Sequence, residues 1–172
     1  MSGDPRIELT GLVHRNPGIH FNALVRELGV SPERVDRYVR DHLEYDTIVR
    51  ESVYGQTHYY PPKFDAWERT ALAMLRRETS RDIIVYLLEH GESSPSEILE
   101  TVGIARSTLS WHLDRLTEQD IVEKRRDGNR IWLDISRPDD LEPLLGEVRP
   151  LLPERLLDRA ERLIDTLFED VG

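Results

Sequence analysis

Residues 94–135 read SPSEILETVGIARSTLSWHLDRLTEQDIVEKRRDGNRIWLDI. Ser94 and Glu97 have the spacing of a capping box, which predicts the start of a helix, and Gly103 predicts its end. From about residue 105 onward, apolar positions recur at the i, i+3, i+4 and i+7 spacing of one helical face. These positions are Leu109, His112, Leu113 and Leu116. The stretch therefore begins with two helices joined by a tight turn.

The rest of the stretch predicts a two-stranded hairpin. Residues 121–126 and 130–135 alternate around Asp127-Gly128-Asn129, and these residue types tolerate the positive φ of a tight turn. Upstream of Ser94, residues 81–90 have helical apolar spacing and stop at Gly91. Residues 81–137 are thus predicted to form three helices followed by a hairpin.

This pattern occurs twice in the chain. Shifting the sequence by 74 positions, without a gap, places Gly29 on Gly103 and Asp46 on Asp120. Apolar positions coincide as well: Leu9 with Ile83, Leu12 with Tyr86, Val13 with Leu87, Leu24 with Ile98, Leu28 with Val102, Val35 with Leu109 and Val39 with Leu113. The first copy therefore predicts a helix through Leu12, helices at 21–28 and from Ser31, and a hairpin of residues 48–53 and 57–60.

The expected fold class is mainly α with small β-hairpins. We assign a first unit to residues 1–62, a connecting helix to 63–80, a second unit to 81–137 and a C-terminal helical segment to 138–172. A final helix is predicted from Glu154 to Asp170, because apolar residues form one stripe along it. The stripe either packs against its own chain or pairs with a second copy. In the second case the dimerisation residues are Leu156, Ala160, Leu163, Ile164, Leu167 and Phe168.

The composition excludes several classes of protein. Cysteine is absent, which excludes disulfides, thiolate metal sites and cysteine nucleophiles. No apolar run approaches the ~20 residues of a membrane span and no signal peptide is recognisable, so we expect a soluble, cytoplasmic protein. We expect neither an enzyme nor a cofactor, since P-loop, nucleotide-turn and triad patterns are absent. The scattered histidines form no ligand pair, so no structural metal is expected.

The segment Gly103–Leu113, GIARSTLSWHL, resembles the turn and recognition helix of winged helix-turn-helix regulators of the MarR and ArsR type. With both copies included, residues 7–137 are similar to the tandem winged-helix regulators of haloarchaea. This resemblance implies a DNA-binding transcription regulator that is a homodimer on double-stranded DNA; its effector stays open. Acidic tandem winged-helix proteins also serve as interaction modules of chromosome-organising or transcription machinery that do not read sequence. That alternative stays open too.

The formal net charge of −10 argues against DNA binding unless positive charge is concentrated locally. Residues 138–172 hold ten acidic and four basic residues, so much of the excess lies outside the two copies. Of the 23 basic residues, only Lys63 and Lys124 are lysines. This acidic, lysine-poor composition resembles that of haloarchaeal proteins and implies a cytoplasm of very high salt.

A recognition helix keeps one face in the core and inserts the N-terminal part of the other into the major groove. The outward residues of the second copy, which we expect to bind DNA, are Arg106, Ser107, Thr108, Ser110, Trp111 and Arg115. The hairpin adds cations suited to phosphates or the minor groove. These are Lys124, Arg125, Arg126 and Arg130. Alternatively, Trp111 covers the hairpin or a subunit contact, the arginines only keep a sheet edge solvated, and His112 is either a core-edge residue or a sensor.

The first copy is less suited to DNA. Its corresponding outward residues are Glu33, Arg34, Asp36, Arg37, Arg40 and Asp41. Three carboxylates would then face the phosphates, which is electrostatically unfavourable. We therefore expect a dimerising, auxiliary or ligand-sensing role for this copy, in which Arg34 and Arg37 are auxiliary DNA contacts.

Overall fold

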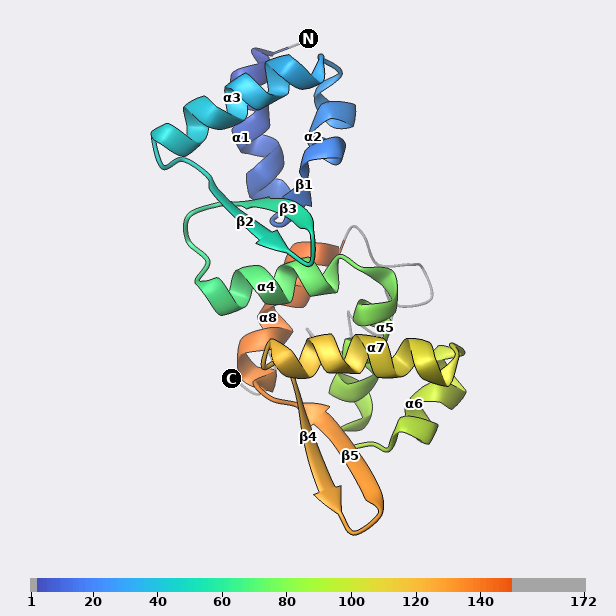
Figure 1. Cartoon of the computed structure of the whole chain (residues 1–172). Helices are drawn as coiled ribbons and strands as arrows, with labels where there is room; N and C mark the ends of the chain where they lie inside the picture. The colour runs from blue at the N-terminus through green and yellow to red at the C-terminus, as the bar shows by residue number, and fades with distance from the viewer. Residues whose placement is uncertain (1–2, 150–172) are drawn as a thin grey trace. The chain divides into compact units, whose positions relative to one another are not determined.

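The computed structural model describes residues 3–149, and the chain divides into two compact units. Unit 1 comprises residues 1–73 and unit 2 residues 74–172. Both combine helices with a small antiparallel hairpin, which confirms the expected fold class (Figure 1). The predicted helix at 154–170 and its six dimerisation residues lie outside the described residues. Among the helices at residues 3–149, none is long and apolar enough to cross a membrane.

Unit 1 packs three helices against a small sheet. Its elements are α1 (Pro5–Arg15), β1 (Ile19–His20), α2 (Phe21–Leu28), α3 (Pro32–Glu44), β2 (Val49–Val53) and β3 (Gln56–Tyr60). Leu9, Leu24 and Val35, one from each helix, are fully buried in a common core. Ile48 and Tyr59 bring the hairpin into the same core. Each such apolar side chain contributes about 1.5–3 kcal/mol by leaving water.

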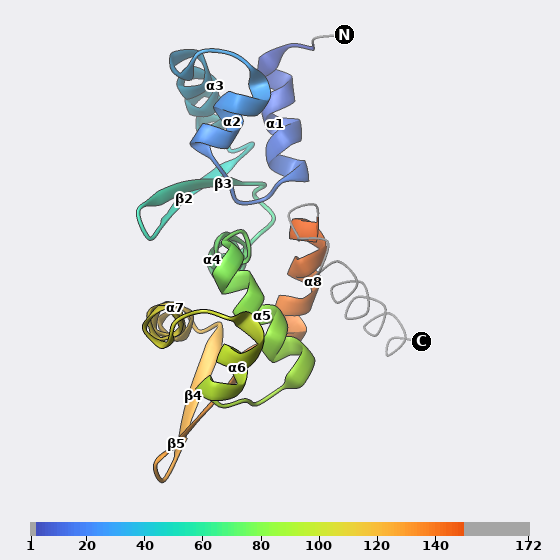
Figure 2. The ribbon, with the colours of Figure 1, turned by 90° about the vertical axis from the view of Figure 1, so that its right-hand side faces the viewer.

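Unit 2 repeats this arrangement. Its elements are α5 (Glu78–His90), α6 (Pro95–Val102), α7 (Arg106–Glu118), β4 (Val122–Asp127), β5 (Arg130–Ile135) and α8 (Pro138–Val148). Ile83, Ile98 and Leu109 are the buried counterparts of the core residues of unit 1. The helices α5, α6 and α7 contact one another, and the β4–β5 hairpin extends away from them in both views (Figures 1 and 2). The far end of this hairpin is therefore exposed.

The second helix of each copy starts at a capped residue at the same repeat position. His20 Nδ1 accepts a hydrogen bond from the Ala23 N–H at the start of α2. Ser94 accepts one from the Glu97 N–H, and Glu97 accepts one in return from the Ser94 N–H. The capping box predicted from the sequence is thus present, and each cap satisfies N–H groups that a helix start leaves without partners.

The ends of these helices also correspond. Gly29 and Gly103 follow α2 and α6 with φ of 64° and 72°, in the left-handed region that favours glycine. After the third helix, Asp46 and Asp120 share a positive φ of 54° and 57°. The 74-residue offset therefore matches backbone conformation as well as residue type.

One pairing differs from the sequence-based expectation. The two-residue strand β1 pairs with β3 through Ile19 opposite Tyr59, which gives a three-stranded sheet in the order β1-β3-β2. The equivalent contact in unit 2 is an isolated bridge between Ser93 and Leu133, at the same offset. Two residues are too few to show the alternation that identifies a strand, so the sequence gives no sign of this pairing.

The structure corrects the single connecting helix expected at 63–80. Helix α4 (Ala66–Leu75) ends before α5 begins at Glu78. The guanidinium of the buried Arg81 donates a hydrogen bond of 3.0 Å to the carbonyl of Leu75, which satisfies one of the acceptors that a helix end leaves without a partner. No glycine or proline occurs at this break, so the apolar spacing alone predicted one helix in place of two.

Candidate nucleic-acid interface

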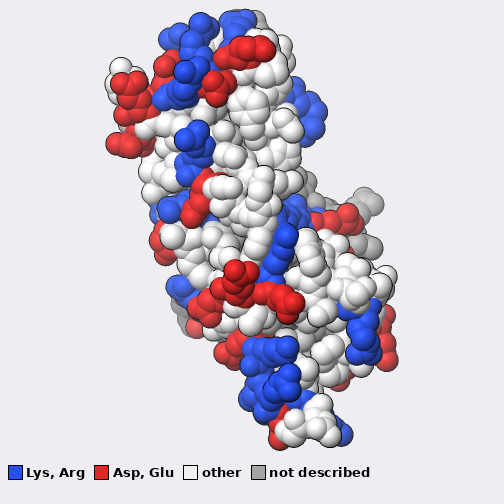
Figure 3. Space-filling model, viewed as in Figure 1, with Lys and Arg blue, Asp and Glu red and all other residues white. Residues whose placement is uncertain are grey.

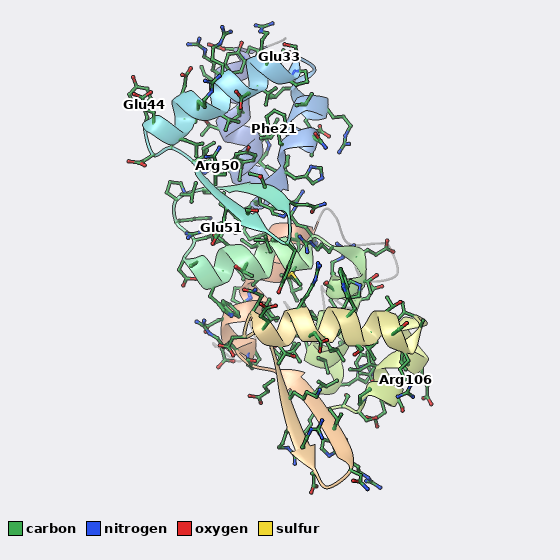
Figure 4. The ribbon with its side chains drawn as sticks, in the orientation of Figure 1. Phe21, Glu33, Glu44, Arg50, Glu51 and Arg106 are labelled. Carbon is green, nitrogen blue, oxygen red and sulfur yellow. The ribbon has the colours of Figure 1, made fainter. Side chains whose placement is uncertain are left out.

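Helix α7 has a buried and an exposed face. Leu109, Leu113 and Leu116 are buried, as their spacing predicted. The exposed residues of its first turns are Arg106, Ser107, Thr108 and Ser110. Helix α7 starts after the left-handed Gly103 and an extended residue 105, which turn the chain sharply out of α6. Figure 4 shows Arg106 at this end of α7, beside α6.

Trp111 and Arg115 form a stacked pair on α7, in which Trp111 is exposed and Arg115 is half-buried. The Arg115 Cζ lies 3.6 Å from the centroid of the Trp111 ring, a cation–π contact between positions four residues apart. The Trp111 side chain is 51% exposed, and its edge contacts the ring of His112 at 4.8 Å between centroids. The two outward residues predicted separately therefore act as a pair, in which the indole holds the guanidinium in place.

His112 lies at the edge of the core of unit 2. Its Nδ1 is 3.1 Å from the Ser80 hydroxyl on α5, and the side chain is half-buried. Burial lowers the pKa of His112, and the positive charges of Arg115 and Arg77 lower it further. Of the two alternatives, a core-edge residue or a sensor, the position of His112 fits the core-edge residue.

The β4–β5 wing carries four exposed cations. The predicted residues Lys124, Arg125, Arg126 and Arg130 are all exposed. The strands are in register from Val122 opposite Ile135 to Asp127 opposite Arg130, so only Gly128 and Asn129 form the turn. Gly128 has a φ of 61°, whereas Asn129 has no positive φ. Figure 3 shows basic atoms covering most of this wing.

One of these cations is already engaged within unit 2. Arg125 donates two hydrogen bonds to Glu92, from Nε at 3.1 Å and from Nη2 at 2.8 Å. These bonds hold the pKa of Glu92 below its ordinary value, and Glu92 in turn raises the pKa of Arg125. Glu92 precedes α6 by three residues and is 33 positions from its partner, so no local pattern could have indicated the contact.

Arg106 lies where α6, α7 and the wing meet. It lines a cavity of about 460 Å³ together with Asn129 and Arg130 of the wing turn and the first residues of α6. A second cavity, of about 230 Å³, lies between α7 and the wing and is lined by Arg106, Lys124 and mainly apolar side chains. Two of the predicted contacts of α7, Arg106 and Ser110, thus line cavities together with Lys124 and Arg130 of the wing.

The C-terminal half of α7 exposes acidic side chains, unlike its first turns. Asp114 and Glu118 are exposed there, and Figure 3 shows a band of acidic atoms over this part of the helix. Phosphates are therefore favoured at the start of α7 and disfavoured at its end.

Helix α3, the counterpart of α7 in unit 1, exposes charges of both signs. Figure 3 shows acidic and basic atoms alternating over it, and Figure 4 places Glu33 and Glu44 at its two ends. Asp36 and Arg40 form an ion pair at 2.9 Å. Arg34 and Arg37, the expected auxiliary contacts, are exposed, and their guanidinium carbons lie within 6 Å of the centroid of the Tyr38 ring, at 5.9 and 5.6 Å.

Within residues 3–149, no group of three or more His, Asp or Glu side chains is placed to hold a metal ion.

Two family profiles match the chain. Residues 3–72 match a family described as an N-terminal helix-turn-helix domain. Residues 76–123 match a family described as winged helix-turn-helix DNA-binding. The gap between the two matches contains the boundary between units 1 and 2.

Curated relatives are regulators of transcription. A helix-turn-helix-type transcriptional regulator of Mycobacterium tuberculosis is 39% identical over 83 residues, which are 48% of this chain and 72% of the relative. The arsenical resistance operon repressor of Staphylococcus aureus is 30% identical over 40% of this chain and 66% of the repressor. A helix-turn-helix-type transcriptional regulator of Methanocaldococcus jannaschii is 28% identical over 74% of this chain. The aligned part is only 32% of that longer relative.

Solved structures include similar chains. One from Mycobacterium tuberculosis is 34% identical, with 52% of this chain and 88% of that chain covered and a TM-score of 0.42. The transcriptional repressor BigR from Xylella fastidiosa is 26% identical, with 49% and 85% covered and a TM-score of 0.43. On the sequence matches to both units and to the mycobacterial regulator, the chain belongs to the helix-turn-helix transcriptional regulators.

Proposed function

We propose that this regulator reads double-stranded DNA through unit 2, with the first turns of α7 in the major groove and the wing on the phosphate backbone. One observation carries the proposal: Arg106 of α7 lines one cavity with Lys124 of the wing and a second cavity with Arg130 of the wing. A recognition helix presents its N-terminal side chains to base edges while neighbouring cations hold the backbone.

The exposed side chains of α7 differ in whether they suit the bases or the backbone of DNA. Arg106 suits a guanine edge or a phosphate, because its fork of donors matches two acceptors at once. Ser107, Thr108 and Ser110 suit phosphates or base edges. Trp111, stacked with Arg115, presents an apolar plate that fits a thymine methyl or a sugar.

The wing supplies the electrostatic part. Lys124, Arg126 and Arg130 are exposed and suit phosphates or the adjacent minor groove. Arg125 can bind a phosphate only when its hydrogen bonds to Glu92 break, so we assign it a phosphate contact under that condition alone.

The test combines Arg106→Ala with Arg126→Ala, because the two residues lie on α7 and on the wing. We expect the double variant to bind at least about tenfold more weakly, since each lost charged contact is worth on the order of 1–3 kcal/mol. Binding is measured by mobility shift on fragments recovered by chromatin immunoprecipitation. Arg26→Ala, an exposed arginine of α2, is the control and leaves affinity unchanged. Unchanged binding by the double variant would favour an interaction module that does not read sequence.

We further propose that the regulator is a homodimer, held by the apolar stripe at Leu156, Ala160, Leu163, Ile164, Leu167 and Phe168. A dimer presents two copies of α7 to two half-sites of an operator. Removal of residues 150–172 is expected to halve the mass measured by light scattering. An unchanged mass after truncation would contradict the assignment of the interface to this stripe.

A further inference from the structure

Three arginines of unit 1 converge on one tyrosine. The guanidinium carbons of Arg6, Arg34 and Arg37 lie 5.3, 5.9 and 5.6 Å from the centroid of the Tyr38 ring. Arg34 and Arg37 come from the first turns of α3, whereas Arg6 comes from α1. The backbone around Arg6 is held against α3, because His42 Nε2 donates a hydrogen bond of 2.8 Å to the Arg6 carbonyl. The fold therefore assembles this cluster from two helices.

The positive charge of this cluster is not neutralised within the described residues. Across residues 3–149, no carboxylate lies within ion-pair distance of Arg6, Arg34 or Arg37. Asp36, the acidic residue between the two α3 arginines, pairs with Arg40 instead. In a chain of net charge −10, three guanidinium groups around one ring without a carboxylate are a local exception. An anion at this point would relieve their mutual repulsion.

Within residues 3–149, the Tyr38 hydroxyl accepts a hydrogen bond but has no acceptor for its own proton. Its ring is 4% exposed, and its oxygen accepts a hydrogen bond of 2.9 Å from Arg34 Nη2. The hydrogen bond from Arg34 and the positive charges of Arg34 and Arg37 lower the pKa of Tyr38. Since guanidinium groups cannot accept, the proton of the hydroxyl has no acceptor among the described residues. It is available to an anion that binds beside the arginines.

The start of α3 adds to the same field. Arg34 is the third residue of the helix, where the macrodipole favours negative rather than positive charge. Ser31, at the cap position, makes no capping hydrogen bond with its side chain. The Ser31 hydroxyl and the helix dipole therefore favour an oxyanion together with the guanidinium groups, and Glu33 is the one acidic residue of this first turn.

We propose that Arg6, Arg34, Arg37 and the Tyr38 hydroxyl form a phosphate-binding site on unit 1. Several guanidinium forks and one hydroxyl donor suit an anion with three or four acceptor oxygens, since guanidinium binds phosphate through two parallel hydrogen bonds. The phosphate belongs either to a DNA backbone or to a free phosphorylated molecule, and both present the same chemistry to the site. This site shares no residue with α7 or the wing.

The site is tested on the full chain with inorganic phosphate as the first probe. Arginine Nε–Hε signals are followed by NMR while phosphate replaces chloride at constant ionic strength. The signals of Arg6, Arg34 and Arg37 are expected to shift together and to saturate. The double variant Arg34→Gln, Arg37→Gln is expected to weaken phosphate binding at least about tenfold, as the loss of charge-assisted bonds implies. Arg40→Gln, one turn further along the same exposed face and paired with Asp36, is the matched control and leaves binding unchanged.

A second arm uses a duplex of arbitrary sequence to identify the source of the phosphate. Shifts of the same three signals with the duplex, and weaker duplex binding by the double variant, assign the site to the DNA backbone. Shifts with inorganic phosphate alone assign it to a free phosphorylated molecule. If neither probe shifts these signals, or if Arg40→Gln has the same effect as the double variant, the proposal is overturned. The titration with inorganic phosphate involves no residue of unit 2, so its failure leaves the proposed function untouched.

Discussion

Tyr38 and His112 occupy the same position of the two copies, 74 residues apart, yet they have different surroundings. Tyr38 contacts Arg6 of the first helix of its copy, and His112 contacts Ser80 at the equivalent position of the other copy. Each side chain therefore joins the third helix to the first. In unit 1 arginine side chains lie around the ring of Tyr38, whereas in unit 2 the ring of His112 contacts the ring of Trp111.

The lowered pKa of His112 predicts how stability depends on pH. Because burial and two arginines disfavour the charged ring, the unfolded chain takes up the proton at a higher pH than the folded chain does. Stabilisation by the neutral ring is complete above about pH 6.5 and is lost as the pH falls toward the lowered value. We expect the free energy of unfolding to fall less between about pH 7.5 and 5.5 in His112→Gln than in the unchanged chain.

Urea unfolding at the two pH values measures this difference. His14→Gln, at an exposed position of α1, serves as the control for a histidine-to-glutamine substitution outside the core. Equal losses of stability in His112→Gln and in the unchanged chain would contradict the prediction.

Among the secondary-structure elements, those with local signals were predictable. The start of α6 at the capping box, its end at Gly103 and the turn at Gly128 each depend on residues a few positions apart. The ion pair of Arg125 with Glu92 and the approach of Arg6 to Tyr38 join residues more than 30 positions apart, so only the folded chain shows them. The stacking of Arg115 on Trp111 was only partly predictable, because a spacing of four residues on a helix permits such a contact without requiring it.

The wing gives a prediction about Glu92. Since Glu92 holds Arg125 away from a DNA backbone, Glu92→Gln is expected to release this arginine and to remove one repelling charge. Affinity for DNA should rise a few-fold at low salt, and the slope of log affinity against log salt should steepen by about one. Both side chains are about half exposed, so solvent screens the ion pair and its loss should change folding stability little.

Fluorescence anisotropy with a labelled duplex over a range of salt concentrations measures both quantities. Glu100→Gln, at an exposed position of α6, removes the same charge without releasing an arginine. Weaker binding by Glu92→Gln would mean that the wing needs Arg125 in its paired position. An equal effect of the two variants would mean that net charge alone is responsible.

At the scale of the whole molecule, the negative charge should limit the electrostatic part of DNA binding. A basic repressor with ~10 phosphate contacts loses affinity with a log–log salt slope near −9. This chain has a net charge of −10, and in unit 2 the proposed phosphate contacts are confined to the wing and the start of α7. We expect a clearly shallower slope, with base contacts and apolar burial supplying more of the affinity.

Binding measured between about 0.1 and 1 M KCl tests this expectation. Arg130→Gln should make the slope shallower by about one, because Arg130 is proposed to contact a phosphate. A slope close to that of ten phosphate contacts would contradict the prediction.

The backbone pairing of Ile19 with Tyr59 and that of Ser93 with Leu133 lie 74 residues apart in the chain, which bears on how the two copies arose. Tandem duplication of a segment of 74 residues accounts for this constant offset, since equivalent backbone contacts of two duplicated copies are separated by the length of the segment. Each descendant copy retains its own helix caps and its own sheet closure, so changes on the surface of one copy need no compensation in the other. Such independence allows one copy to specialise while its twin acquires a different ligand.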